Sequence, residues 1–236
     1  MSRNLTAELL GFDDYIPPHA SASDDAILKG GGRITFSGQV QNYQSTVSQV
    51  VNLLGTEDQA ASYLNKCIYS IGLGSNDYLN NYFMPQFYNT GNQYTPEDPN
   101  VLARQSPDGV TCVDNINSAN QIFNNKLKGV VDTFSNELPD AKLIYINSYG
   151  IFQDIISNPS TYGFTDTNTG CCGVGKNNGQ ITCLPLQTPC DDRRGHLFWD
   201  AFHPTEAGNV VVAQRAYSAQ SPSDAYPMDI QHLAQI

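Results

Sequence analysis

Apolar residues recur at helical spacing from Gln41 onward, and they predict the first clear element of the chain. The members of this stripe are Tyr43, Val47, Val50, Val51 and Leu54. Gly55 follows the stripe and predicts its end. The next four residues begin with Thr56 and finish with Gln59, which is the pattern of a capping box. They predict a second, shorter helix that runs to about Asn65.

Two short apolar runs, residues 67–71 and 142–146, predict buried strands. Between them, apolar residues in steps of three and four predict a long helix over residues 114–137. A short helix is predicted over residues 151–156, and Thr205 predicts the cap of a last helix. Strands that alternate with helices along the chain predict an α/β fold with a parallel sheet.

Charge and apolar run length exclude several classes of function. The 236 residues include 12 basic and 23 acidic side chains, which gives a net charge of −11. A surface of that sign repels polyphosphate, so no nucleic-acid partner is expected. No apolar run approaches the roughly 18 residues of a membrane span. The first residues also lack the apolar region of a secretory signal peptide.

Four of the six cysteines lie within twenty residues of a loop rich in Gly, Asn and Thr. They are Cys171, Cys172, Cys183 and Cys190. Zinc sites use cysteine pairs separated by two to four residues, which neither pair matches, so disulfides are favoured over a metal site. Neighbouring cysteines bridge badly, so Cys171 and Cys172 are expected to pair with Cys183 and Cys190, in an order that the sequence does not fix. Disulfides persist in an oxidising compartment.

Asp200 and His203 form the sharpest local signal for chemistry. At this spacing in a loop, a carboxylate can accept the Nδ1–H of the imidazole and fix its tautomer. Nε2 is then available to take a proton from a hydroxyl nucleophile. The pattern is common, however, and most isolated occurrences of it are incidental.

Gly74 and Asn76 form a second signal, directly after the predicted strand 67–71. In open α/β sheets, sites form outside the carboxyl ends of the strands. An Asn side chain there can donate a hydrogen bond to a developing oxyanion. The alternative is an ordinary turn, for which Gly, Ser and Asn are typical residues.

Both signals lie in blocks that resemble the plant GDSL esterases/lipases, a branch of the SGNH hydrolases. Residues 68–82 resemble the G-x-N-D block of that family, and residues 198–207 resemble its C-terminal D-x-x-H block. The Gly-Cys-Cys-Gly at residues 170–173 and the Ser-Pro-Asp-Gly before Cys112 also match the plant branch. The resemblance covers nearly the whole chain, with the blocks in the family's order.

The resemblance implies a flavodoxin-like sandwich with a parallel sheet, and a single domain over residues 1–236. It implies a secreted, extracellular hydrolase that acts on carboxylic esters, including lipid and acyl esters, without a cofactor. Carried over by position, His203 is the general base and Asp200 its orienting carboxylate. Asn76 is an oxyanion donor, and Gly74 opens the same block.

The chain departs from the family where the nucleophile is expected. The family's nucleophile is the Ser of a Gly-Asp-Ser-Leu block at the first strand, and these 236 residues contain no Gly-Asp-Ser. The sequence therefore starts after the first strand of the family, and the domain is expected to be incomplete at the N-terminus. A hydrolase without its nucleophile is expected to turn over very little ester.

A second departure falls within residues 96–105, where the family has a further helix and strand. The missing strand belongs between the two predicted ones, so they must pair directly or leave backbone groups unpaired. The cysteine that normally partners Cys112 is missing with it. We therefore expect the chain to be partly disordered or prone to aggregation.

The alternative function is that of a non-catalytic protein, which binds a lipid or glycan through the former substrate cleft of the family. Asn4 begins a glycosylation sequon, which matters only if the chain enters the secretory path. The sequence gives no indication of the oligomeric state.

Overall fold

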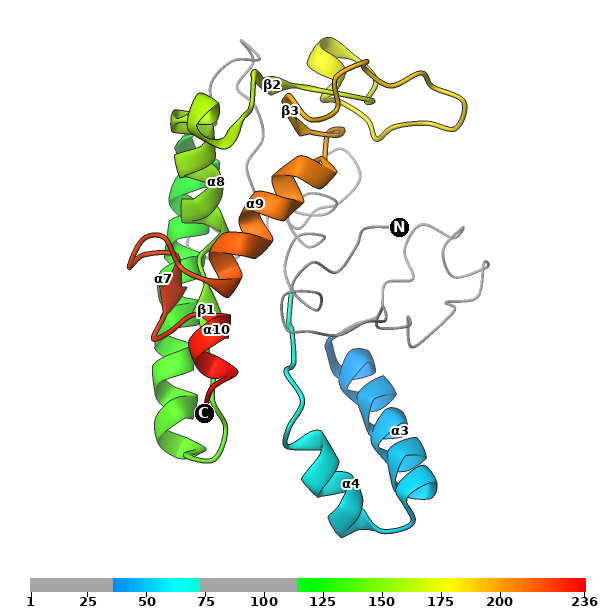
Figure 1. Cartoon of the computed structure of the whole chain (residues 1–236), viewed down its shortest axis with the longest axis vertical. Coiled ribbons are helices and arrows are strands. Elements are labelled where there is room, and N and C mark those ends of the chain that lie inside the picture. The colour runs from blue at the N-terminus through cyan, green and yellow to red at the C-terminus, as the bar shows by residue number, and fades with distance from the viewer. Residues whose placement is uncertain (1–35, 73–113) are drawn as a thin grey trace. The chain divides into compact units, whose positions relative to one another are not determined.

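The computed structural model describes residues 36–72 and 114–236, which belong to two compact units (Figure 1). One unit is Asp14–Gly72, and the other comprises Met1–Asp13 and Leu73–Ile236. The first contains helices α3 and α4, and the second contains every element from α7 onward.

Helices α3 (Phe36–Leu54) and α4 (Glu57–Leu64) confirm the two helices expected from the apolar stripe and the capping box. Gly55 ends α3 with φ of 95°, a left-handed conformation that glycine adopts without steric cost. Its N–H still donates to the carbonyl of Val51 at 2.8 Å. Thr56 caps α4, because its hydroxyl oxygen accepts the N–H of Gln59 at 3.2 Å.

Residues 67–72 form no strand, so the strand predicted there is wrong. Their apolar side chains are partly exposed, with Ile68 at 43% and Ile71 at 75% of full exposure. Tyr69 instead packs edge-on against Tyr43 of α3, with ring centroids 5.5 Å apart and a 2.8 Å hydrogen bond between the hydroxyls. An apolar run becomes a buried strand only where a neighbouring strand pairs with its backbone.

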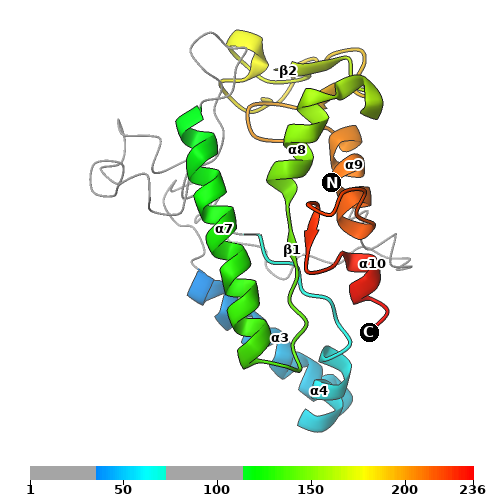
Figure 2. The ribbon, with the colours of Figure 1, turned by 90° about the vertical axis from the view of Figure 1, so that its left-hand side faces the viewer.

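The second strand prediction is right in place but wrong in length and direction. After α7 (Asp114–Glu137), strand β1 covers only Tyr145–Ile146. It pairs antiparallel with β4 (Ala225–Tyr226), whereas a parallel partner was expected. Figure 2 shows β1 between α7 and β4, leading directly into α8 (Ser148–Ser157). The C-terminal segment supplies the partner that the sequence pattern did not reveal.

Parallel pairing occurs farther along the chain, between β2 (Asp166–Gly170) and β3 (His196–Phe198). Two 3₁₀ turns, η2 (Pro159–Tyr162) and η3 (Lys176–Asn178), lie on either side of β2 in the sequence. The described part of the fold is therefore mixed α/β, with small sheets of both directions.

A compact apolar core holds α8, β3 and α9 (Glu206–Tyr217) together. Its fully buried members are Ile151, Ile155, Phe164 and Leu197. A last short helix, α10 (Ile230–Leu233), follows β4. Because β3 contributes to this core, the loop that leaves its end starts from a fixed point.

A buried ion-pair network fastens α8 and α9 to the chain before β4. Arg215 on α9 is 3% exposed and donates to both carboxylate oxygens of Asp224, at 3.0 and 2.6 Å. It also donates to Asp154 of α8 at 2.5 Å and to the hydroxyl of Tyr162 at 2.8 Å. A buried guanidinium requires this number of partners to offset its lost hydration.

Across residues 36–72 and 114–236, no helix combines the length and hydropathy needed to cross a bilayer.

Candidate active site

The Asp–His pair predicted from the sequence lies in the tight loop between β3 and α9. The N–H of Trp199 donates to the carbonyl of His203 at 2.8 Å, which closes the loop on itself. The N–H of Thr205 donates to the carbonyl of Leu197 at 2.9 Å. The Thr205 hydroxyl oxygen accepts the N–H of Gly208 at 3.1 Å as the cap of α9. The loop is therefore fixed at both ends.

The carboxylate of Asp200 and the imidazole of His203 are directly hydrogen-bonded. Nδ1 of His203 lies 2.8 Å from Oδ1 of Asp200. The same oxygen accepts the backbone N–H groups of Phe202 at 2.9 Å and His203 at 3.0 Å. The Asp200 side chain is 2% exposed and that of His203 is 64% exposed. A buried carboxylate thus holds an accessible imidazole, and Nε2 is the nitrogen left to exchange a proton.

The other carboxylate oxygen of Asp200 is held by a distant part of the chain. Oδ2 accepts the hydroxyl of Thr182 at 2.7 Å and the backbone N–H of Cys183 at 3.1 Å. Both oxygens of a buried charge are therefore satisfied, as its desolvation requires.

These contacts decide the charge of the carboxyl group. Burial by itself raises the pKa of Asp200, but the hydrogen bonds from Thr182, Phe202, Cys183 and His203 outweigh burial and lower the pKa to about 2. Asp200 is consequently ionised throughout the neutral range. An ionised acceptor favours a proton on Nδ1 of His203 and leaves Nε2 as the proton-accepting nitrogen.

Two disulfides cross-link the loop that supplies Thr182 and Cys183. They join Cys171 to Cys190 and Cys172 to Cys183, so the structure settles the order that the sequence left open. The N–H of Cys172 also donates to the carbonyl of Trp199 at 2.7 Å. One cross-link therefore ties together both segments that touch the Asp–His loop. Two disulfides are compatible with an oxidising compartment.

Comparison with known proteins places these residues in a family. Residues 20–216 match the model of the GDSL-like lipase/acylhydrolase family. This chain belongs to the GDSL lipase/acylhydrolase family. It is 55% identical to the GDSL esterase/lipase At1g29670 of Arabidopsis thaliana, over 99% of this chain and 78% of that protein. It is 52% identical to the GDSL esterase/lipase At5g45670 of the same plant, over 99% of this chain and 79% of that protein.

The two alignments differ in length from the chain itself. Each runs over 286 residues, although this GDSL family chain has 236. The relatives therefore carry residues inside the matched span that have no counterpart here.

Several residues nominated from the sequence lie outside the described residues. They are Gly74 and Asn76 of the G-x-N-D block, Asn4 of the sequon, and Cys112. The structure therefore brings together Asp200, His203 and the four loop cysteines, and the oxyanion residues remain a prediction. Cys67, within residues 36–72, is exposed and forms no disulfide.

A second Asp-x-x-His pair in this GDSL family chain has the same local geometry. Nδ1 of His232 lies 2.6 Å from Oδ1 of Asp229, and the N–H of His232 donates to the same oxygen at 2.9 Å. Oδ2 of Asp229 accepts the backbone N–H of Ala219 at 3.0 Å. Asp229 caps the short helix α10, so the pair has a structural role there. The spacing alone therefore does not identify a catalytic pair.

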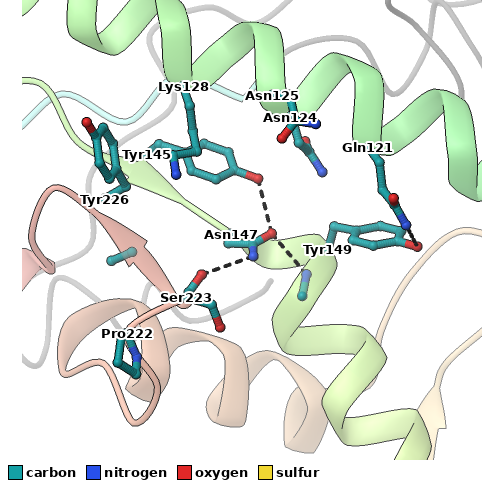
Figure 3. Close-up of a pocket in the computed structure, with 12 residues that line it drawn as sticks. Gln121, Asn124, Asn125, Lys128, Tyr145, Asn147, Tyr149, Pro222, Ser223 and Tyr226 are labelled. Carbon is teal, nitrogen blue, oxygen red and sulfur yellow. Dashed lines mark hydrogen bonds between the residues drawn. The ribbon is translucent and has the colours of Figure 1, made fainter.

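A pocket of about 360 Å³ lies between α7 and the β1–β4 pair, and neither Asp200 nor His203 lines it (Figure 3). Asn147 links its walls: Oδ1 accepts the hydroxyl of Tyr145 at 3.1 Å, and Nδ2 donates to the carbonyl of Ser223 at 3.0 Å. Within residues 36–72 and 114–236, no three His, Cys, Asp or Glu side chains gather as metal ligands.

Sequence reasoning missed Thr182 and the N–H of Cys183. The available signal was that they lie directly before and at a cysteine of the loop. A disulfide holds that part of the loop close to another segment of the fold. The disulfide pairing was needed to tell which segment that is.

Proposed function

We propose that this protein's site hydrolyses carboxylic esters, and that His203 and Asp200 form its acid–base pair. The observation that carries the proposal is the 2.8 Å contact between exposed His203 and buried, ionised Asp200, in a chain of the GDSL family. The substrate class is a small-molecule or lipid ester, because both relatives are GDSL esterases/lipases by name.

The pair acts on both halves of an acyl transfer. Nε2 of His203 takes the proton of the nucleophilic hydroxyl as that oxygen attacks the ester carbonyl, and the ester C–O bond then breaks as the imidazolium protonates the leaving alcohol. A water molecule, deprotonated by the same nitrogen, then attacks the carbonyl carbon of the acyl intermediate. The bond from that carbon to the nucleophile's oxygen breaks, and the imidazolium returns the proton to this oxygen as the acid leaves. Asn76 donates to the oxyanion, and Gly74 begins the same block.

The nucleophile of this mechanism is a serine in a Gly-Asp-Ser block, which the 236 residues do not contain. We therefore propose that these residues alone turn over little ester. The alignment with a relative runs over 286 residues, which is longer than this chain of 236. This difference supports the proposal that the domain lacks internal residues that the relative has. The corresponding fold is one flavodoxin-like domain over residues 1–236 that lacks one internal strand.

Secretion is part of the same proposal. The two disulfides support an extracellular location, since they persist only under oxidising conditions. Asn4 is then a candidate for N-glycosylation.

The test combines a fluorophosphonate probe with ester turnover by the purified 236-residue chain. We expect no labelled serine and a rate far below that of the two Arabidopsis relatives measured in parallel. Any residual rate falls in His203→Ala and persists in His232→Ala, because only His203 belongs to the proposed site. A serine labelled in the folded chain contradicts the missing nucleophile, and equal loss in both variants contradicts the role of His203.

The absence of Gly-Asp-Ser from these residues favours one other function, a non-catalytic protein that binds a lipid or glycan. Stoichiometric binding without turnover, by a chain that melts cooperatively, supports this alternative. A non-cooperative melt argues against it.

A further inference from the structure

Thr182 contacts the carboxylate of Asp200 from a distant position in the sequence. The Thr182 hydroxyl donates to Oδ2 at 2.7 Å across a sequence separation of 18 residues. Within the acid–base pair, the contacts to Oδ1 all come from the loop that contains Asp200 itself. The two oxygens of the carboxylate are thus held by different parts of the chain.

We propose that Thr182 is a positioning residue for the Asp200–His203 pair, and that the Cys172–Cys183 disulfide holds it in place. The proposal rests on the proposed function, because it names what orients the carboxylate of that same site. It concerns the alignment of Oδ1 with Nδ1 of His203, and it assigns Thr182 no contact with substrate.

The torsion that orients an Asp carboxylate needs an anchor of this kind. Rotation about the bond to an sp² carboxyl carbon has broad minima, so the side-chain rotamer alone does not fix where the oxygens point. The donors to Oδ2, Thr182 and the N–H of Cys183, stop this rotation from the far side. Oδ1 then stays directed at His203.

The Cys172–Cys183 disulfide restrains the position of Thr182 relative to Asp200. Cys183 is bonded to Cys172, whose N–H donates to the carbonyl of Trp199, the residue before Asp200. Thr182 is therefore attached to the Asp–His loop through one covalent bond and one backbone hydrogen bond. Reduction of the Cys172–Cys183 bond removes the covalent part and frees Thr182 to leave Asp200.

The chain supplies its own reference in the Asp229–His232 pair. Oδ1 of Asp229 also contacts the backbone N–H and the ring Nδ1 of its His, as Oδ1 of Asp200 does. Its Oδ2, however, accepts the backbone N–H of Ala219 in place of a side-chain hydroxyl. A change at Thr182 is expected to reach His203 and to leave His232 unaffected. A general loss of structure affects both pairs.

The first test determines the tautomers of His203 and His232 by NMR above pH 8. It uses ¹H–¹⁵N correlation spectra based on the two-bond couplings of the imidazole ring. In the unmodified chain we expect His203 to carry its proton on Nδ1. Thr182→Val, which removes the hydroxyl at similar volume, reduces this preference about fivefold, the equilibrium factor of one hydrogen bond. Thr182→Ser retains the hydroxyl and the preference, and His232 is the same in all three chains.

The second test follows the ionisation of Asp200 between pH 5 and pH 2 through its carboxyl ¹³C signal. Loss of a donor to the charged form raises the pKa, so Thr182→Val moves the Asp200 transition upward by about one pH unit. Thr182→Ser restores it, and the Asp229 transition stays in place. In the unmodified chain, the Cys183 amide shifts with the same midpoint as Asp200, although the two residues are 17 positions apart.

The outcomes decide the proposal without any measurement of turnover, so an inactive chain does not obscure them. The proposal is overturned if Thr182→Val leaves the His203 tautomer and the Asp200 transition unchanged, or if it alters His232 equally. If that variant does not fold, the Cys183 amide in the unmodified chain decides: a shift that does not follow Asp200 overturns the proposal. Reduction of the disulfides under native conditions is expected to reproduce the Thr182→Val spectra at His203.

Discussion

At the scale of single residues, Asp200 shows how a common spacing becomes a specific site. The Asp-x-x-His pattern by itself produces a compact turn in which one carboxylate oxygen accepts both the backbone N–H and the ring N–H of the His, as also seen at Asp229. Asp200 differs from Asp229 in that its other carboxylate oxygen accepts a hydrogen bond from the hydroxyl of Thr182. The local pattern could be read from the sequence, and the distant donor could not, because it depends on tertiary structure.

The lowered pKa of Asp200 predicts a loss of stability in acid. The folded-state pKa of about 2 lies below the value near 3.9 in an unfolded chain, so the unfolded state takes up the proton first as pH falls. The stabilisation is fully present above pH 5 and disappears between roughly pH 4 and pH 2, with a magnitude on the order of 2 kcal/mol.

Urea unfolding at pH 5 and pH 3 checks this prediction. Asp200→Asn removes the titrating group and is expected to reduce the difference in free energy of unfolding between the two pH values. The exposed Asp191 provides the matched control, Asp191→Asn, which is expected to retain the full difference. An unchanged pH dependence in Asp200→Asn contradicts the assignment.

At the scale of elements, helices were predicted well and strands were not, for a physical reason. The helices α3, α4, α7 and α8 are specified by local periodicity and caps, and each lies close to its expected position. A strand depends on a partner elsewhere in the chain. The run at residues 67–71 remains without one, whereas β1 pairs with β4, whose two residues carry no strand pattern of their own.

Helix α9 offers a direct test of how an element supports the site. Thr205 is 3% exposed; its hydroxyl caps α9 and donates to the carbonyl of His196 at 2.7 Å, so it connects the helix to β3. Thr205→Ala is expected to lower the free energy of unfolding by about 1–2 kcal/mol. Thr205→Ser keeps the hydroxyl and is expected to retain most of the stability of the unmodified chain. Chemical denaturation of the three chains measures the difference, and equal stability of the Ala and Ser variants contradicts a role for the hydroxyl.

At the scale of the whole molecule, the sequence predicted the family, an α/β class and the contact between Asp200 and His203. It did not establish the direction of the sheets, because strand pairing depends on partners elsewhere in the chain. The described part of the unit Asp14–Gly72 exposes large apolar side chains. In its described part, Leu53 is 84% and Ile71 is 75% exposed.

Exposed apolar side chains of this size predict self-association of the chain. Leu53→Lys on α3 removes one such contact and is expected to weaken association about tenfold, as seen by sedimentation over a range of concentrations. Its neighbour Asn52 is also exposed and polar, so Asn52→Lys makes the same change of charge without removing an apolar group. Equal effects of the two variants indicate that charge, and not Leu53, governs association.

The nested cross-links of residues 171–190 have a practical consequence for anyone who prepares this protein. Cys171 and Cys172 are adjacent, so exchange of their partners gives a covalent isomer of identical mass and composition. In that isomer Cys183 is tied to Cys171, and the register that brings Thr182 to Asp200 shifts by one position. A purified sample can therefore be homogeneous by mass and still contain two populations at the Asp–His loop. Peptide mapping of the bridges, fraction by fraction, distinguishes them before any rate is interpreted.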